Sequence, residues 1–318
     1  MADSNSPVRL TVFGSGAVGS NLAAHLCTVP GFEVSVVARG EHLRAIQNEG
    51  LELSSEGRRL HCTPRATDDA STLPVQDLVF VTLKAHSVPP MADKIARLMG
   101  PTGLAVFFVN GLPWWMEPEP DARLAPIDRE RVIGGVVYSS NEIKRPGHVV
   151  HDGGDRWAVG EPLGGSSERI ERIAALIAQA GLNGVAQPEL RQEIWIKLLY
   201  NASVNPVAAL TRLDCAQLSP APALNRIGMQ IRREIAAAAA SDGIDLSGHP
   251  ALADWDDMKL STPVKPSMLQ DVLAGRGMEV DAIVDAPRRV AARAGIPTPT
   301  LDVVSGLVGG LDESLRVN

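Results

Sequence analysis

Cysteine is scarce in this chain of 318 residues, and long apolar runs are missing. The three cysteines, Cys27, Cys62 and Cys215, form neither a disulfide framework nor a zinc-binding spacing. No run of about 18 apolar residues occurs, which argues against a transmembrane helix. The polar residues 1–7 lack the apolar segment of a secretory signal. These absences lead us to expect a cytoplasmic protein with no membrane partner.

Excess positive charge is missing too. The chain has 30 Lys and Arg against 37 Asp and Glu, a formal net charge of −7, so it offers no general attraction to nucleic acid. Its 45% of hydrophobic and 21% of charged residues are typical of a folded globular protein. At roughly 150 residues per domain, the length suggests two domains. We therefore expect an enzyme of two domains or of one large domain.

The first half alternates short apolar runs with amphipathic stretches. The apolar runs predict strands over residues 8–13, 33–38, 78–83, 104–109 and 131–138. Several of them lack polar alternation, which is typical of parallel strands covered on both faces. Residues 50–62 predict a polar hairpin. Strands that alternate with helices indicate an α/β fold with an N-terminal Rossmann-like, doubly wound sheet.

The second half is expected to be helical. Helical periodicity marks residues 166–180, 189–202, 224–241, 268–273 and 280–294, and no clear strand follows residue 186. Pro206 should kink or interrupt the second of these helices just after Asn205. The boundary predicted near Gln187-Pro188 divides the chain into a first domain of residues 1–187 and an all-helical C-terminal domain of residues 188–318.

A glycine-rich motif follows the first predicted strand. It has the order G-x-G-x-x-G and consists of Gly14, Ser15, Gly16, Ala17, Val18 and Gly19. In such motifs the first glycine allows a tight turn, the second lets a pyrophosphate approach the backbone, and the third lets the following helix pack closely. The helix N-terminus adds amide donors. The motif predicts a dinucleotide cofactor, and the alternative is a glycine turn needed only for packing.

Basic residues stand where this cofactor would be recognised. Domains specific for NAD hold the ribose 2′-hydroxyl with an acidic residue about 20 positions past the motif, but here Arg39 closes the second strand. A guanidinium suits a 2′-phosphate, which favours NADPH. The alternative is a solvated Arg39, with Glu33 or Glu41 at the ribose. Lys84 and Asn110 end the next two strands and are placed to touch the cofactor. The alternative for each is a turn residue, since Asn110-Gly111 is also an ordinary turn pair.

Lys197, Asn201 and Asn205 recur at every fourth position of a predicted helix. At this spacing the three side chains form one polar stripe. Apolar neighbours such as Trp195 and Leu198 indicate that the helix is largely buried. Buried amides and a buried lysine need partners, so the stripe predicts a ligand site. The alternative is a stripe that faces solvent or is satisfied by the other domain.

Two further patterns concern ligands. Ser267 is predicted to cap a helix, with Gln270 completing a capping box, and a helix start can also bind a substrate carboxylate. His148 and His151 have no third ligand nearby, so we predict no metal site.

In this combination the chain resembles the ketopantoate reductase family (2-dehydropantoate 2-reductase) over nearly its whole length. The resemblance is carried by the glycine motif, Arg39, Val81-Thr82-Leu83-Lys84-Ala85, Asn110-Gly111, the segment from Trp195 to Pro206, Ser267-Met268-Leu269-Gln270-Asp271 and Glu279. Each match is unspecific alone, whereas their order is typical of the family. The resemblance implies NADPH-dependent reduction of ketopantoate to pantoate, a step towards coenzyme A.

The resemblance also implies roles for the matched residues. Lys197 would be the general acid that protonates the keto oxygen as hydride arrives, and burial among apolar residues could lower its pKa. Substrate contacts would come from Asn110, Asn201, Asn205 and Ser267. Cofactor contacts would come from Gly14, Ser15, Gly16, Ala17, Val18, Gly19, Arg39, Lys84, Asn110 and Glu279.

Some positions depart from the family pattern. Cys215 replaces a common substrate-binding asparagine, and Ile283-Val284-Asp285 replaces a frequent Ile-Asn-Gly. Trp114-Trp115 marks a variant branch of the family. The two side chains could line an apolar pocket or, equally well, pack in a core or an interface. Three alternatives remain: the same chemistry on another branched or bulky 2-oxo acid, a β-hydroxyacid dehydrogenase, and an NADPH-binding sensor without turnover.

The apolar Leu301–Leu311 could dock on the helical domain or on a second subunit, which weakly favours a homodimer.

Overall fold

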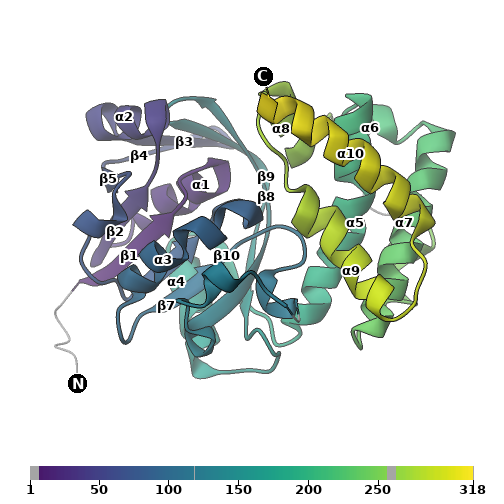
Figure 1. Ribbon diagram of the computed structural model, residues 1–318. Helices are drawn as coiled ribbons and strands as arrows, with labels where there is room; N and C mark the ends of the chain where they lie inside the picture. The colour runs from purple at the N-terminus through teal and green to yellow at the C-terminus, as the bar shows by residue number, and fades with distance from the viewer. Residues whose placement is uncertain (1–6, 118, 256–262, 318) are drawn as a thin grey trace. The chain divides into compact units, whose positions relative to one another are not determined.

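The computed structural model describes residues 7–117, 119–255 and 263–317, which form two compact units (Figure 1). The first contains Met1–Val109 and Pro120–Leu190, and the second contains Asn110–Glu119 and Arg191–Asn318. The division after Leu190 lies close to the boundary predicted at residue 187. Asn110–Glu119, expected in the first domain, belongs instead to the second unit. The segment bonds to residues of the second unit that lie 87 to 172 positions further along the chain.

A mixed ten-stranded sheet organises the first unit. Its strands are β1 (Val8–Phe13), β2 (Phe32–Val37), β3 (Leu51–Ser55), β4 (Arg58–Cys62), β5 (Arg65–Thr67), β6 (Leu78–Val81), β7 (Leu104–Phe107), β8 (Val132–Arg145), β9 (His148–Gly160) and β10 (Asn183–Ala186). Their order is β4-β3-β9-β8-β7-β6-β1-β2-β5, with β10 beside β9. Parallel pairing joins β7, β6, β1, β2 and β5. The predicted Rossmann-like sheet is confirmed in this half.

The remaining strands introduce antiparallel pairs. The hairpin predicted over residues 50–62 is formed by β3 and β4. The strand expected over 131–138 is longer in the structure, where β8 continues to Arg145. After a turn at Gly147 the chain returns as β9, which pairs with β8. The sequence prediction missed this extension because polar residues such as Asn141 and Lys144 break the apolar run.

Helices cover both faces of the sheet. One buried cluster joins Leu10 and Val12 of β1 to Phe80 of β6 and to residues of three helices. The alternating residues Phe13 and Val81 are buried on the opposite face. A fourth helix packs on β6 and β7 without entering that cluster. The three helices of the cluster are α1 (Ala17–Leu26), α2 (Gly40–Glu49) and α4 (Glu168–Gln179), and the fourth is α3 (Ala92–Met99).

Within the described residues, the second unit contains helices and no strand. Its helices are α5 (Leu190–Thr211), α6 (Cys215–Leu218), α7 (Pro222–Ser241), α8 (Ser267–Leu273), a π-helical turn over Asp281–Asp285, α9 (Ala286–Arg293) and α10 (Pro299–Val317). The segment expected to dock does so, since α10 packs on α7 through buried residues such as Leu301 and Val308. None of the described helices has the length and apolar content needed to cross a membrane.

Pro206 does not interrupt its helix, so the predicted interruption is wrong. It lies inside α5, which continues to Thr211. Proline at this position removes the hydrogen bond to the carbonyl of Ala202, at a cost of about 3 kcal/mol. Ala202, Val207 and Ala208 are buried, and their packing outweighs that loss.

Candidate functional site

Three parallel strands of the first unit end in register. Phe13, the last residue of β1, pairs with Val37 of β2 and with Val81 of β6. The chain proceeds from β1 to β2 on one side and later reaches β6 on the other. Nucleotides bind doubly wound sheets at such a reversal of strand order, outside the carboxyl ends of the strands. The glycine motif, Arg39 and Lys84 all follow these strand ends, as predicted from the sequence.

The glycines have the geometry that a pyrophosphate needs. Gly14 has a φ of 108°, a region that favours glycine. A Cβ added to Gly19 would lie 2.3 Å from the carbonyl oxygen of Gly14, so the helix packs closely on the loop. A Cβ added to Gly16 would meet nothing within 4 Å, which leaves the loop open on that side. Because the first amides of α1 lack intrahelical acceptors, the loop fits a dinucleotide.

A partly buried hydrogen-bond chain supports this loop, and no sequence pattern pointed to it. The amide of Gly147 donates to Nδ1 of His42 at 3.1 Å, so Nε2 carries the ring proton and donates to Ser20 Oγ at 3.0 Å. Ser20 Oγ donates to the carbonyl of Ser15 and lies 2.8 Å from Ser15 Oγ. Burial lowers the pKa of His42, which keeps the ring neutral near pH 7.

Arg39 is exposed at the start of α2. Within the described part of the chain, its guanidinium has no hydrogen bond or ion pair. Glu33 instead lies near the beginning of β2, where it pairs with Arg9 at 3.5 Å. Glu41 pairs with Arg44 at 4.0 Å. Arg39 thus follows the carboxyl end of β2, whereas Glu33 lies near the other end of that strand.

The predicted acid and its neighbours come together in the second unit. Lys197 Nζ donates to Asn110 Oδ1 at 3.0 Å, and Asn110 Nδ2 donates to Glu279 Oε2 at 3.1 Å. Burial lowers the pKa of Lys197 to about 8, against the raising effects of the Glu279 and Glu193 carboxylates. Asn110 thus holds the ammonium and the carboxylate through opposite ends of one amide.

Asn205 and Ser267 also meet in this unit. Asn205 is buried, and its Nδ2 donates to Ser267 Oγ at 3.4 Å. The predicted capping box is wrong, because Pro266 occupies the cap position and Gln270 Nε2 donates to the carbonyl of Lys265. Ser267 is instead the first residue of α8 and is exposed. Its hydroxyl is therefore available to a ligand while Asn205 orients it.

Asn201 lies one turn after Lys197 and one turn before Asn205, on the same face of α5. The start of α5 is tied to the end of α7, because Asp242 accepts hydrogen bonds from Arg191 at 2.8 Å and from the Trp195 indole at 2.9 Å. This attachment fixes the helix that carries the predicted stripe.

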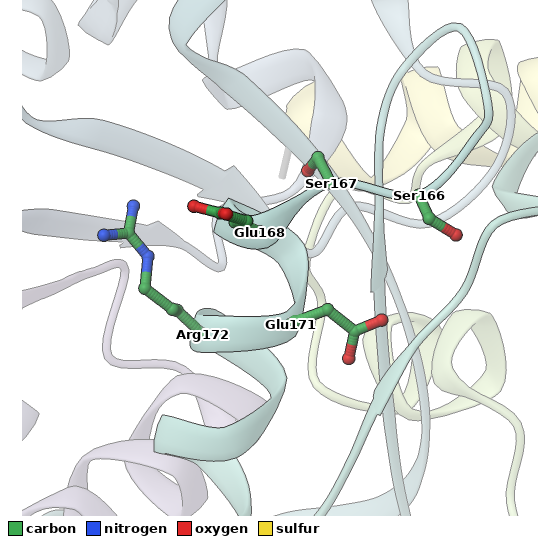
Figure 2. Close-up of a pocket in the computed structure, with 5 residues that line it drawn as sticks. All are labelled: Ser166, Ser167, Glu168, Glu171 and Arg172. Carbon is green, nitrogen blue, oxygen red and sulfur yellow. The ribbon is translucent and has the colours of Figure 1, made fainter.

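The histidine pair of the first unit bonds within the β-sheet. His148 and His151 bond to Ser54 and Ser55 of the neighbouring strand. Among the described residues, no group of three His, Cys, Asp or Glu could hold a metal ion. A shallow hollow of about 480 Å³ lies at the start of α4 (Figure 2), where the five side chains do not converge on one point. It is lined by Ser166, Ser167, Glu168, Glu171 and Arg172, none of which was predicted as a site residue.

Fold and site together define a class. A glycine loop at the switch point of a Rossmann-like sheet, joined to a helical unit that presents a lysine of lowered pKa among asparagines, is the arrangement of an oxidoreductase with a nicotinamide cofactor. Residues 10–164 match the model of the ketopantoate reductase family (PanE/ApbA), and residues 189–312 match the model of its C-terminal domain. The chain belongs to the ketopantoate reductase family.

Individual relatives agree with this assignment. A 2-dehydropantoate 2-reductase from Mesorhizobium japonicum is 38% identical over 95% of this chain and 97% of its own. A crystal structure of a candidate ketopantoate reductase from Ralstonia solanacearum MolK2 is 34% identical, has a TM-score of 0.89, and covers 98% of this chain and 99% of its own. A D-mandelate dehydrogenase with NADH and anilino(oxo)acetate shares the fold, with a TM-score of 0.87, 22% identity, and coverage of 97% and 100%.

Proposed function

We propose that this protein reduces the keto group of 2-dehydropantoate to the alcohol of pantoate with NADPH. The observation that carries the proposal is the hydrogen bond of 3.0 Å from Lys197 Nζ to Asn110 Oδ1, made by a lysine whose pKa is lowered to about 8. Family membership supports the substrate, since the Mesorhizobium japonicum relative is named for it. It also weighs against a β-hydroxyacid dehydrogenase and a sensor without turnover.

The cofactor part of the proposal depends on the first unit. When bound, NADPH supplies the hydride that adds to the keto carbon. The open loop at Gly16 and the first turn of α1 would hold its pyrophosphate. Arg39, exposed after β2, would bind the 2′-phosphate. Lys84 would add positive charge at the end of β6.

Proton transfer is assigned to the second unit. As the keto carbon accepts hydride, negative charge builds on its oxygen, and the Lys197 ammonium donates a proton there to complete the alcohol. Neutral Lys197 then regains a proton from water. Asn110 and Glu279 orient the ammonium. Asn201, Asn205 and Ser267 would bind the substrate hydroxyl and carboxylate oxygens.

A second candidate is the same reaction on a bulkier 2-oxo acid. Trp114 and Trp115 follow Asn110 closely in the chain and pack edge to face, with ring centroids 5.7 Å apart. Both residues are only partly buried, so an apolar substituent of a substrate could lie against them. This pair is the feature that would favour an aromatic or branched side chain over that of 2-dehydropantoate.

Steady-state kinetics distinguishes the two candidates. The loss of NADPH absorbance is measured with 2-dehydropantoate and with a panel of branched and aromatic 2-oxo acids. We expect 2-dehydropantoate to have the highest kcat/KM. A higher value for an aromatic acid would transfer the assignment to the second candidate, and no turnover of any 2-oxo acid would refute both.

We also propose a homodimer in the cytoplasm. The outer face of α10 supports the dimer, since Val303 and Leu307 are 62% and 57% exposed one turn apart. Light scattering should give twice the monomer mass of 33.7 kDa. A Leu307→Lys variant should then shift the mass towards the monomer, and a monomeric wild-type protein would contradict this part of the proposal.

A further inference from the structure

One carbonyl in the second unit is released from its helix. In the π-helical turn Asp281–Asp285, the amide of Ala286 donates to the carbonyl of Asp281, five residues earlier. In an α-helix the same amide would bond to Ala282. The π-type partner of Ala282 would be the amide of residue 287, but Pro287 has no N–H. The carbonyl of Ala282 therefore accepts neither the α-helical hydrogen bond from residue 286 nor a π-helical one from residue 287.

The segment that carries Asn110 uses this carbonyl. The amide of Leu112 donates to the carbonyl oxygen of Ala282 at 2.8 Å. The approach is so close that a Cβ added to Gly111 would lie 2.2 Å from that oxygen, and Gly111 also has a φ of 80°. A glycine is required here for both reasons. The bond lies two residues from Asn110, whose side chain holds Lys197 and Glu279.

The other end of the segment is attached to the same region. Arg289 of α9 donates to both oxygens of Glu117, through Nε at 3.3 Å and through a terminal nitrogen at 2.5 Å. It also bonds to Asp281. Although burial would lower the pKa of Arg289, hydrogen bonds with Asp281 and Glu117 raise it, so the Arg289 guanidinium stays charged. The segment Asn110–Glu117 is thus held near both ends by Ala282 and Arg289.

We propose that Pro287 is a positioning residue for the reduction. By withholding an amide from Ala282, it leaves that carbonyl to Leu112 and so keeps the Asn110 amide on Lys197. The inference rests on the proposed function, since it concerns the efficiency of the same proton transfer. The effect of Pro287 passes through one backbone hydrogen bond, from the Leu112 amide to the Ala282 carbonyl.

The test replaces Pro287 with alanine, whose amide can donate to Ala282 and compete with Leu112. We expect Pro287→Ala to lower kcat roughly 3- to 10-fold, because the loss of one hydrogen bond has about this effect on a rate. The affinity for NADPH should change little. Lys197 would lose the acceptor that stabilises its ammonium, while Glu279 and Glu193 still face it. The alkaline fall of kcat should therefore move to lower pH, which general destabilisation would not cause.

Two controls separate this role from a structural one. Pro299→Ala makes the same substitution at the exposed first residue of α10 and should leave kcat and its pH profile unchanged. Gly111→Ala weakens the same hydrogen bond by adding a Cβ beside the Ala282 carbonyl. The double variant Gly111→Ala/Pro287→Ala should therefore lower kcat by less than the product of the two single fold-changes. Equal effects of Pro299→Ala and Pro287→Ala, or an unshifted profile in Pro287→Ala, would overturn the inference.

Amide hydrogen exchange on the wild-type protein tests the contact without a variant and without turnover. Leu112 should exchange slowly because its amide is bonded to Ala282 and its side chain is buried. Fast exchange at Leu112 would overturn the inference even if Pro287→Ala failed to fold. Failure of the proposed function would appear differently, as absence of wild-type turnover with every 2-oxo acid.

Discussion

Lys197 Nζ and Asn110 Oδ1 lie 3.0 Å apart although 87 residues separate them in the chain. The lysine comes from the middle of α5, and the asparagine from a segment that leaves the β-sheet unit to join the helical unit. Asn110 bonds at its other end to Glu279, so residues from three distant parts of the sequence meet at one amide. This convergence supports our proposal that Lys197 is the proton donor.

The pH dependence of turnover follows from the lowered pKa of Lys197. Only the protonated form can donate, and burial lowers that pKa from 10.5 to about 8. We expect kcat for reduction to be constant below about pH 8 and to fall as the pH rises above it. The measurement is kcat at saturating substrate and NADPH across this range. A kcat that increases through pH 8 would mean that the neutral amine is the active form.

Arg39 should decide which dinucleotide is used. Arg39→Asp removes the guanidinium and places a carboxylate where the 2′-phosphate would bind, so we expect NADPH affinity to fall at least roughly 10-fold. NADH affinity should change little or improve. Fluorescence titration with both cofactors measures the change, and Arg44→Asp, an exposed arginine of the same helix, controls for net charge. Equal losses of both cofactors in Arg39→Asp would refute this role.

Ser20 should affect cofactor binding through the glycine loop. Its hydroxyl links His42 to Ser15, and Ser20→Ala breaks all three of those hydrogen bonds. We expect KM for NADPH to rise roughly 3- to 10-fold, with kcat at saturating NADPH nearly unchanged. Ser71→Ala, at an exposed position of the same unit, is the control. A fall in kcat with no change in KM would place the role of Ser20 elsewhere.

Much of the fold could be predicted because its signals are local. Apolar runs located the parallel strands, and the glycine motif located the loop at their ends. The full length of the β8–β9 hairpin could not be predicted, because polar residues near its turn, such as Asn141 opposite His151, break the apolar pattern and pair only across the strands. The effect of Pro206 was misjudged for a similar reason, since the packing around α5 is tertiary.

The residues of the candidate site also divide into those that the sequence could predict and those that it could not. Lys197, Asn201 and Asn205 were visible because a helix repeats them on one face. Nothing local points to Ala282 or Pro287, since their role depends on a π turn and on an amide from Leu112 far away in the chain. Ser267 was placed correctly on α8, but its capping role was wrong, because Asn205 rather than the helix backbone engages its hydroxyl.

Arg232 should matter for stability rather than for chemistry. It is fully buried, its guanidinium lies 4.6 Å from the Trp255 ring centroid and 5.1 Å from that of Tyr200, and it donates to the carbonyls of Ala251 and Asp254. Arg232→Met leaves those carbonyls without this donor, so we expect a loss of about 3 kcal/mol or more. Urea denaturation measures it.

The neighbouring Arg233 is exposed and provides a matched control for that measurement. Arg233→Met should change the free energy of unfolding by less than about 0.5 kcal/mol. Similar stabilities of the two variants would show that the buried position of Arg232 contributes nothing specific.

The most direct test of the central claim is the rate of hydride transfer in a single turnover of Lys197→Ala with NADPH and 2-dehydropantoate. We expect a rate about 10²- to 10⁴-fold below wild type, the usual effect of losing a general acid, with NADPH affinity retained. Lys144→Ala, which removes an exposed lysine of the first unit, should react at the wild-type rate. A near-normal rate in Lys197→Ala would contradict the assignment of Lys197 as the proton donor.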